Sequence, residues 1–305
     1  MTCPFLKEAQ VKYCLASSVR KLIPIAAAGR ADEKCASEAH ATCPVFLTQP
    51  VDQQPVDQPA PGPCPFLGES LMQYCGAAPV AKMVPYSESV LSRCGNNRYR
   101  YCELYLVMAN PGAPAGDVDG LPLPDALQYS ANHMWLDVGK DGLCHAGMDA
   151  FLSRALGLAE RVAFVWQSGQ HRATAVVTVN GVDHDVVFPN PFLLTNCNLY
   201  LRTNPAPLTS DPYTAGWLFE GVATAETTQH LFQGAAARQW MEHEQHHINE
   251  FLQQLHDPNG HLAADGGVFV QGLSRYLDRE QMLALFHEFF SPMRVKREHV
   301  KREQP

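Results

Sequence analysis

The feature that most constrains this chain is a cysteine pattern that occurs twice in its N-terminal third. The stretch "CPFLKEAQVKYC" begins at Cys3, and "CPFLGESLMQYC" begins at Cys64. Two further cysteines follow in each copy, so the gaps between successive cysteines are 10, 20 and 7 residues in the first copy and 10, 18 and 7 in the second. Such an internal duplication predicts two copies of one small module.

Each copy supplies four thiol side chains, which are soft ligands that favour zinc or an iron–sulfur cluster. A histidine ligand common to both copies is excluded, because His40 corresponds to Tyr99. Disulfides and buried thiols are the remaining alternatives, and the two modules either bind separately or share ligands. The predicted metal ligands are Cys3, Cys14, Cys35, Cys43, Cys64, Cys75, Cys94 and Cys102.

Composition limits the compartment and the partners. The chain has 305 residues, of which 46% are hydrophobic. Its formal net charge of -8 argues against broad attraction to nucleic acid. Its one basic run, "RVKREHVKREQP", is a solvated tail. No apolar run approaches the roughly 18 residues of a membrane span, so we expect a cytoplasmic protein. Thiols stay reduced in that compartment, which favours metal chemistry over disulfides.

The pattern along the chain predicts an α+β multidomain protein with two small four-cysteine modules, a β-rich domain and a C-terminal helical segment. The expected divisions are module one at 1–46, a Pro/Gln-rich linker at 47–63, module two at 64–106, a loop at 107–124, the β-rich domain at 125–223 and the helical segment with its basic tail at 224–305.

Within the β-rich region, Asn180-Gly181 is a strong hairpin signal, because both residues tolerate positive φ. One short helix is expected to end at Gly157. We expect Cys144 and Cys197, outside the duplicated pattern, to be buried thiols that behave as small hydrophobes.

Several pieces of this region carry a family resemblance. The stretch "YSANHMWLDV" from Tyr129, the helix ending "RALG" and above all "DPYTAGWL" from Asp211 to Leu218 resemble the glycine cleavage system H protein family. The resemblance covers roughly a third of the chain, 125–223. It implies a barrel-sandwich hybrid fold of the lipoyl type, which carries aminomethyl groups on a lipoyl arm among glycine decarboxylase, aminomethyltransferase and dihydrolipoyl dehydrogenase.

That carrier role depends on one lysine in a tight hairpin turn. Here the corresponding position falls at Val182 or Asp183, and neither side chain can form the amide with lipoate. The nearest lysines along the chain are Lys140 and Lys296. We therefore expect no lipoate on this protein, and we expect His184 in the same turn to be a solvated residue.

The helical segment contains "HEQHH" at 243–247, which satisfies the His-Glu-x-x-His pattern of zinc hydrolases. On a helical wheel His243, His247 and Glu250 share one face, so a metal site there is a hypothesis, with Glu244 as the general base of a metal-dependent hydrolase. The polar Gln245 between them favours an ordinary amphipathic helix instead. A last helix is expected to begin after Ser274 or Asp278 and to end at Pro292.

The sequence lacks a nucleophile with a base partner and a nucleotide fingerprint. It therefore predicts a non-catalytic protein that docks to protein partners such as lipoyl-handling or redox enzymes, with electron transfer or redox sensing if the metals are iron clusters. The alternatives are a carrier or assembly subunit of a glycine-cleavage-like or other lipoyl-dependent system, and the hydrolase.

Overall fold

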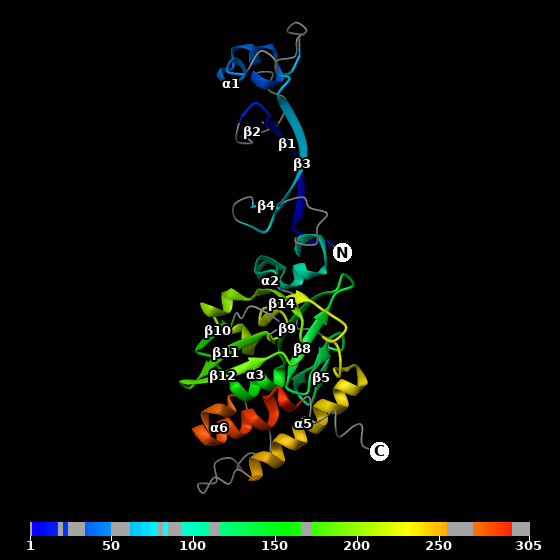
Figure 1. Ribbon diagram of the computed structural model, residues 1–305, viewed down its shortest axis with the longest axis vertical. Coiled ribbons are helices and arrows are strands. Elements are labelled where there is room, and N and C mark those ends of the chain that lie inside the picture. The colour runs from blue at the N-terminus through cyan, green and yellow to red at the C-terminus, as the bar shows by residue number, and fades with distance from the viewer. Residues whose placement is uncertain are drawn as a thin grey trace. The chain divides into compact units, whose positions relative to one another are not determined.

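The chain forms two compact units, Met1–Met108 and Ala109–Pro305, in a computed structural model (Figure 1). The structure describes residues 2–17, 21–23, 34–49, 62–78, 82–84, 93–109, 116–165, 172–254 and 271–294. Most of the expected linker 47–63 and the basic tail beyond Arg294 lie outside the described residues. The expected helical segment falls in the same unit as the β-rich region.

The first unit is built on a long antiparallel ribbon of two strands, one from each cysteine copy. Both strands have nine residues, and each is extended sideways by a short strand, giving the sheet order β2-β1-β3-β4. The strands are β1 (Leu6–Cys14), β2 (Lys21–Ile23), β3 (Leu67–Cys75) and β4 (Lys82–Val84).

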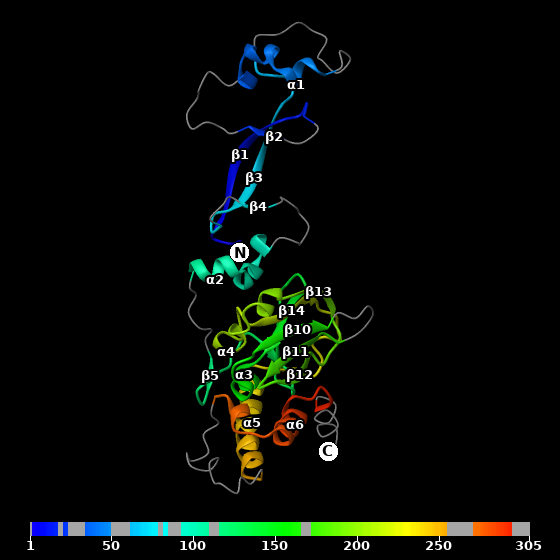
Figure 2. The same cartoon turned by 90° about the vertical axis from the view of Figure 1, so that its left-hand side faces the viewer.

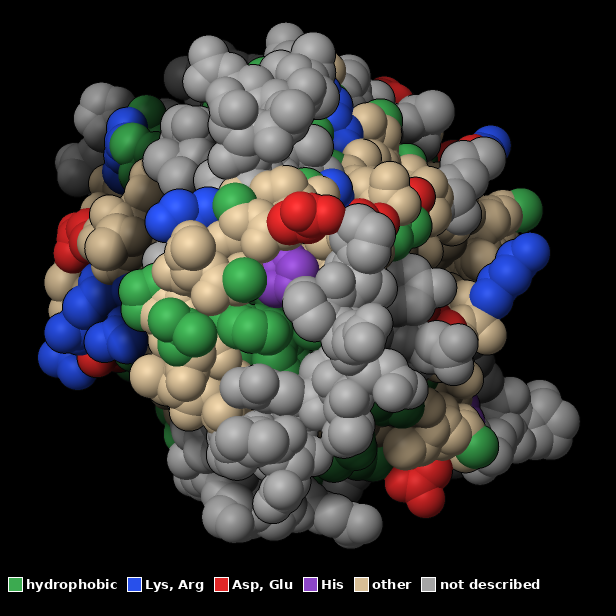
Figure 3. Space-filling view, turned by 90° about the horizontal axis from the view of Figure 1, so that it is seen from above, with side chains coloured by type: hydrophobic (Ala, Val, Ile, Leu, Met, Phe, Trp, Pro, Cys, Tyr) green, Lys and Arg blue, Asp and Glu red, His purple; other side chains and the backbone are tan. Residues whose placement is uncertain are grey.

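Both copies continue with two 3-10 turns and a helix, so they have the same order of elements. These are Lys34–Ala36, Glu38–Thr42 and α1 (Pro44–Leu47) in the first copy, and Arg93–Gly95, Asn97–Tyr101 and α2 (Glu103–Ala109) in the second. Two perpendicular views show α1 at one end of the ribbon and α2 at the other (Figures 1 and 2). Apolar side chains reach the surface at the α1 end, where Val45 and Leu47 are exposed (Figure 3).

The second unit is a mixed α/β structure with three sheets in its described part. The six-stranded sheet has the order β13-β14-β9-β8-β7-β15, the three-stranded sheet β10-β11-β12, and the smallest sheet pairs β5 with β6. The strands are β5 (Asp117–Val118), β6 (Leu121–Pro122), β7 (Gln128–Tyr129), β8 (Met134–Val138), β9 (Leu143–Met148), β10 (Arg161–Val165), β11 (Thr174–Val179), β12 (Val182–Val187), β13 (Leu193–Cys197), β14 (Trp217–Val222) and β15 (Phe232–Gln233).

Large apolar side chains from the strands, α3 and the connecting segments fill the core of this unit, among them Trp135, Phe151, Phe188 and Trp217. The expected short helix is confirmed as α3 (Ala150–Leu156), which Asp149 caps by accepting a hydrogen bond from the Leu152 amide. Two further short helices, the 3-10 turn Leu199–Arg202 and α4 (Pro207–Ser210), lie between β13 and β14.

The C-terminal helices pack on the β-rich part of the same unit (Figures 1 and 2). They are α5 (Ala235–Gln254), the 3-10 turn Leu273–Arg275, α6 (Arg279–Leu285) and the π-helical turn Phe286–Phe290. Of the two expected caps Asp278 begins α6, in a capping box with Gln281. Among the described residues, no helix has the length and apolar character needed to cross a bilayer.

Candidate functional site

One end of the β1–β3 ribbon, here called the Cys64 end, joins the start of the second copy to the first copy. The Cys64 amide donates to the Cys35 carbonyl at 2.7 Å, and the Leu15 amide donates to the Phe66 carbonyl at 2.8 Å. The rings of Phe46 and Phe66 meet edge to face with centroids 5.9 Å apart. The beginning of the second copy is therefore seated among residues of the first.

The opposite end, here called the Cys3 end, repeats this arrangement with the copies reversed. The Cys3 amide donates to the Cys94 carbonyl at 2.8 Å, and the Gly76 amide donates to the Phe5 carbonyl at 2.8 Å. The ring of Phe5 lies 6.2 Å from that of Tyr105, between centroids. The beginning of the first copy is therefore seated among residues of the second.

The cysteines of these two ends are thiols rather than disulfides. Cys3 and Cys64 are buried, whereas the other six are half-buried. In the described part of the chain, no three Cys, His, Asp or Glu side chains are gathered closely enough to hold a metal ion. The metal-binding assignment of the eight cysteines stays a prediction.

In the second unit, the β11–β12 hairpin is the feature that the sequence singled out. Its two-residue turn is confirmed, with φ of 49° at Asn180 and 72° at Gly181. The Asn180 side-chain amide donates to the Ser274 carbonyl at 3.0 Å. The His184 ring, two residues into β12, stacks on Phe286 with centroids 4.2 Å apart. The C-terminal segment thus packs against this hairpin.

The expectation that His184 is solvated is wrong. The residue is only 2% exposed, because the helical turn that carries Phe286 lies against it. Burial is the main reason that the pKa of His184 is lowered, so its ring is neutral at physiological pH. It acts as part of the core between the hairpin and the C-terminal helices.

Comparison with known proteins gives the relationship of this unit. The chain is 30% identical over 110 residues to the glycine cleavage system H protein of Halorhodospira halophila, covering 35% of this chain and 84% of that protein. It is 32% identical over 102 residues to the H protein of Micrococcus luteus, covering 32% of this chain and 80% of that one. The chain belongs to the glycine cleavage system H protein family.

A solved H protein from Mycobacterium marinum is also similar, with 23% identity, a TM-score of 0.31, and coverage of 40% of this chain and 99% of that one. No family model matches the chain. The H-protein relationship confirms the resemblance read from the sequence and concerns about a third of the residues.

In this H-protein-like unit, the hairpin position expected for lysine is filled by short side chains. Val182 begins β12 and is half-buried. Asp183 accepts a hydrogen bond from the Thr178 hydroxyl at 2.6 Å and lies 3.3 Å from the Arg161 guanidinium. The Thr178 hydrogen bond is the largest cause of a lowered Asp183 pKa. These contacts hold Asp183 as a carboxylate against the three-stranded sheet.

The three residues of the proposed histidine metal site are not brought together as a ligand set in the described structure. His243 and Glu250 are exposed on α5. His247 instead lies 3.4 Å from the Glu288 carboxylate and packs on the ring of Phe289. These contacts are those of an amphipathic helix that docks on the π-helical turn.

Glu244, the candidate general base, lies on the adjacent, core-facing side of α5 and is fully buried. Arg294 donates to both of its carboxylate oxygens, at 2.6 and 2.7 Å. His133 Nε2 lies 3.3 Å from the same carboxylate, and its Nδ1 lies 2.8 Å from Asp149. A buried carboxylate paired with Arg294 and His133 is removed from the solvent water that a hydrolase base activates.

This buried chain of His133, Asp149, Glu244 and Arg294 is a feature that the sequence reading missed. Burial would lower the pKa of His133, but the charges and hydrogen bonds of Asp149 and Glu244 outweigh it and raise the pKa. The His133 ring also stacks on Phe151, with centroids 4.1 Å apart. The network joins the strand region, α3, α5 and the C-terminal end in one set of ionic contacts.

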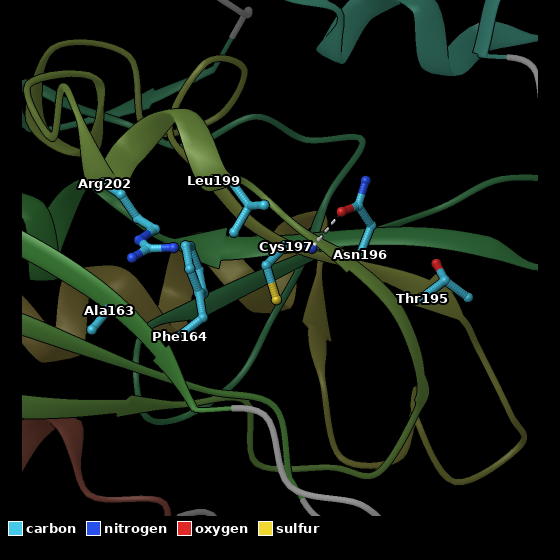
Figure 4. Close-up of a pocket in the computed structure, with 7 residues that line it drawn as sticks. All are labelled: Ala163, Phe164, Thr195, Asn196, Cys197, Leu199 and Arg202. Atoms are coloured by element: carbon cyan, nitrogen blue, oxygen red, sulfur yellow. Dashed lines mark hydrogen bonds between the residues drawn. The ribbon is translucent and has the colours of Figure 1, made fainter.

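A pocket of about 460 Å³ lies between β10, the end of β13 and the 3-10 turn Leu199–Arg202. The side chains of Cys197, Leu199, Phe164 and Arg202 lie around it, with Arg202 beside the Phe164 ring (Figure 4). Burial raises the pKa of the Cys197 thiol to about 11. The thiol is therefore protonated at neutral pH and a poor nucleophile, and the expectation that Cys144 and Cys197 are buried is confirmed.

Proposed function

We propose that this chain is an H-protein family member without a lipoyl arm, which acts by docking to protein partners and carries metal in its N-terminal cysteine unit. The lipoyl arm of the family requires a lysine in the hairpin turn. No lysine occurs between Lys140 and Lys296, so neither the hairpin nor its flanking strands can be acylated in the family's way.

The packing of the hairpin supports the same proposal. Asn180 is hydrogen-bonded to Ser274, and His184 is stacked under Phe286. A swinging arm needs a turn that projects freely, whereas Asn180 of this turn and His184 of β12 contact the C-terminal segment of the same chain. These contacts are the observation that carries the proposal, and from them we infer a docking rather than a carrying role.

The cysteines support the second part of the proposal. Eight thiols in two duplicated sets are a soft donor set, which suits two zinc ions or two iron–sulfur clusters. If the sites hold iron–sulfur clusters, the chain would transfer electrons or sense redox state for the partner to which it docks. If the sites hold zinc, the N-terminal unit would be a structural scaffold. We expect no catalytic residues in either case.

The first test is the mass of the intact, denatured protein after expression in cells that lipoylate a co-expressed H protein of the Halorhodospira type. We expect the co-expressed protein to gain a lipoyl group and this chain to keep the mass of its sequence. A lipoyl adduct on this chain would overturn the proposal.

The second test is direct binding to purified glycine decarboxylase, aminomethyltransferase and dihydrolipoyl dehydrogenase, measured by interferometry. We expect the chain to bind at least one of them and to support no glycine cleavage by itself. Binding to none would refute docking to lipoyl-handling enzymes, and turnover without another H protein would favour a carrier subunit instead.

A further inference from the structure

The pairing of β1 with β3 is symmetric with respect to the duplication. Leu6 faces Cys75 at one extreme and Cys14 faces Leu67 at the other, and Gln10 faces Leu71 at the centre. Leu71 is also the residue of the second copy that corresponds to Gln10. The two copies are therefore related by a local two-fold axis through the middle of the ribbon, as in an isologous contact between identical chains.

This register separates the first two cysteines of each copy. Cys14 ends β1, whereas Cys3 precedes its first residue, Leu6. Eight residue steps at about 3.3 Å each separate Leu6 from Cys14 by about 26 Å. Sulfurs that bind one zinc ion lie about 2.3 Å from it, hence within about 5 Å of one another. Cys3 and Cys14 cannot bind the same metal, and the same holds for Cys64 and Cys75.

The same register brings cysteines from different copies to the same end. At the Cys3 end, Cys3 is hydrogen-bonded through its backbone to Cys94, and Cys75 ends the strand that pairs with Leu6. At the Cys64 end, Cys64 is hydrogen-bonded to Cys35. Each end thus has one cysteine from the start of one copy and the later cysteines of the other.

Electrostatic contacts agree with this grouping. Cys3 interacts electrostatically with Cys102 and Cys75 of the second copy. Cys64 interacts in the same way with Cys14 and Cys43 of the first copy.

We propose that the two copies exchange their first cysteines, so that each end of the ribbon forms one four-thiolate site for zinc or an iron–sulfur cluster. The two ligand sets are Cys3, Cys75, Cys94 and Cys102 at the Cys3 end, and Cys64, Cys14, Cys35 and Cys43 at the Cys64 end. The proposal deepens the metal binding proposed above and rests on it.

Exchange has a consequence for how metal and fold depend on each other. Because no three of the described ligating side chains are yet gathered, binding must draw the four thiols of each end together. Each site then cross-links the beginning of one copy to the body of the other, so metal binding stabilises the ribbon itself. Neither copy can complete a site alone, because its own first cysteine lies at the far end.

Paired serine variants of the full chain distinguish exchange from separate modules. Cys14 and Cys75 are matched positions, since each is half-buried and ends its nine-residue strand. Cys3→Ser/Cys75→Ser disables one site under exchange, whereas Cys3→Ser/Cys14→Ser disables both. We expect the first variant to retain about half of the wild-type metal and the second to retain almost none.

The readouts are zinc, iron and acid-labile sulfide per chain after anaerobic purification, together with the visible spectrum of Co²⁺-substituted protein. The opposite ranking of the two variants would overturn exchange while leaving the proposed metal binding intact. A wild-type chain with neither zinc nor iron would overturn metal binding itself. Zinc without sulfide indicates two zinc sites, and iron with equal sulfide indicates clusters.

A second measurement covers the case in which both double variants fail to fold. The wild-type full chain is treated with a metal chelator, oxidised with diamide under native conditions and digested for disulfide mapping. We expect Cys3 to be joined to Cys75, Cys94 or Cys102. Disulfides from Cys3 to Cys14, Cys35 or Cys43 would overturn the proposal.

Discussion

Replacing Arg294 with methionine tests the buried ionic network directly. The guanidinium is 8% exposed in its side chain and donates to both oxygens of Glu244, whose side chain is fully buried. Methionine keeps much of the volume but removes the positive charge. The variant therefore leaves a buried carboxylate that has lost its strongest partner, and we expect the second unit to be strongly destabilised.

The pKa of Glu244 shows how strongly its partners stabilise the carboxylate. Burial alone would raise that pKa, but the hydrogen bond and charge of His133 together with Arg294 lower it from 4.5 to about 2. Because His133 contributes to this lowering, the expected cost of losing Arg294 is taken from buried ion pairs in general, in which removing one partner costs about 3–5 kcal/mol. We expect Arg294→Met to lower the free energy of unfolding by about 3 kcal/mol.

The assay is urea denaturation followed by tryptophan fluorescence, because all four tryptophans lie in the unit Ala109–Pro305. The matched control is Arg238→Met on α5, the helix that carries Glu244. Arg238 also contacts a carboxylate, that of Asp125, through two nitrogens at 2.5 and 3.0 Å, but its side chain is 52% exposed. Solvent screens such a pair, so little change is expected. If Arg294→Met destabilises no more than Arg238→Met, the buried network is not what holds the C-terminal end.

Acid should destabilise the second unit through Glu244. The stability that its ionised carboxylate contributes is complete above its unfolded pKa of 4.5 and is lost as the pH falls towards 2. Urea midpoints should therefore fall over this pH range, and they should fall less steeply in Arg294→Met. Gly157→Ala should lower the free energy of unfolding by at least twice the ~1 kcal/mol expected for Gly142→Ala. Both glycines have positive φ, but only at Gly157 would the added Cβ lie 2.7 Å from a backbone atom. Equal urea midpoints for the two variants would contradict this. Iodoacetamide at pH 8 should label Cys197 and Cys144 only after unfolding, because both thiols are buried. Peptide mass mapping measures this, and rapid labelling of the native protein would show that the thiols are accessible.

The role of Glu244 shows how a local motif can mislead when the helix face is ignored. The five letters "HEQHH" predict a catalytic pattern, but the buried positions of α5 are Ala237, Trp240, Met241, Glu244 and Ile248. Steps of three or four residues between them place the glutamate on the core face. The sequence therefore contained the signal for a buried carboxylate, whereas its partner Arg294 lies fifty residues away and left no local trace.

The strand region was more predictable because its signals are local. The Asn180-Gly181 turn, the helix that ends at Gly157 and the buried Cys144 and Cys197 follow from residues adjacent in sequence. The covering of His184 by Phe286 depends on packing between segments about a hundred residues apart, so a turn histidine looked solvated.

The duplication was equally clear from the cysteine spacing, but the spacing does not say which cysteines of the two copies lie together in space. An antiparallel register between equivalent strands is a property of both copies together. Within one copy, the four cysteines look like one ligand set. Only the placement of Cys3 beside Cys94, at the end of the ribbon away from Cys14, shows that chain proximity and spatial proximity differ here.

The two-fold ribbon also bears on how such a unit can arise. A single module with one strand and four cysteines would form the same ribbon as a homodimer, with each chain lending its first cysteine to its partner. Joining the two genes turns that dimer into one chain and removes the need for the halves to stay identical. The 20- and 18-residue gaps and the replacement of His40 by Tyr99 show that the halves have since diverged around a shared architecture.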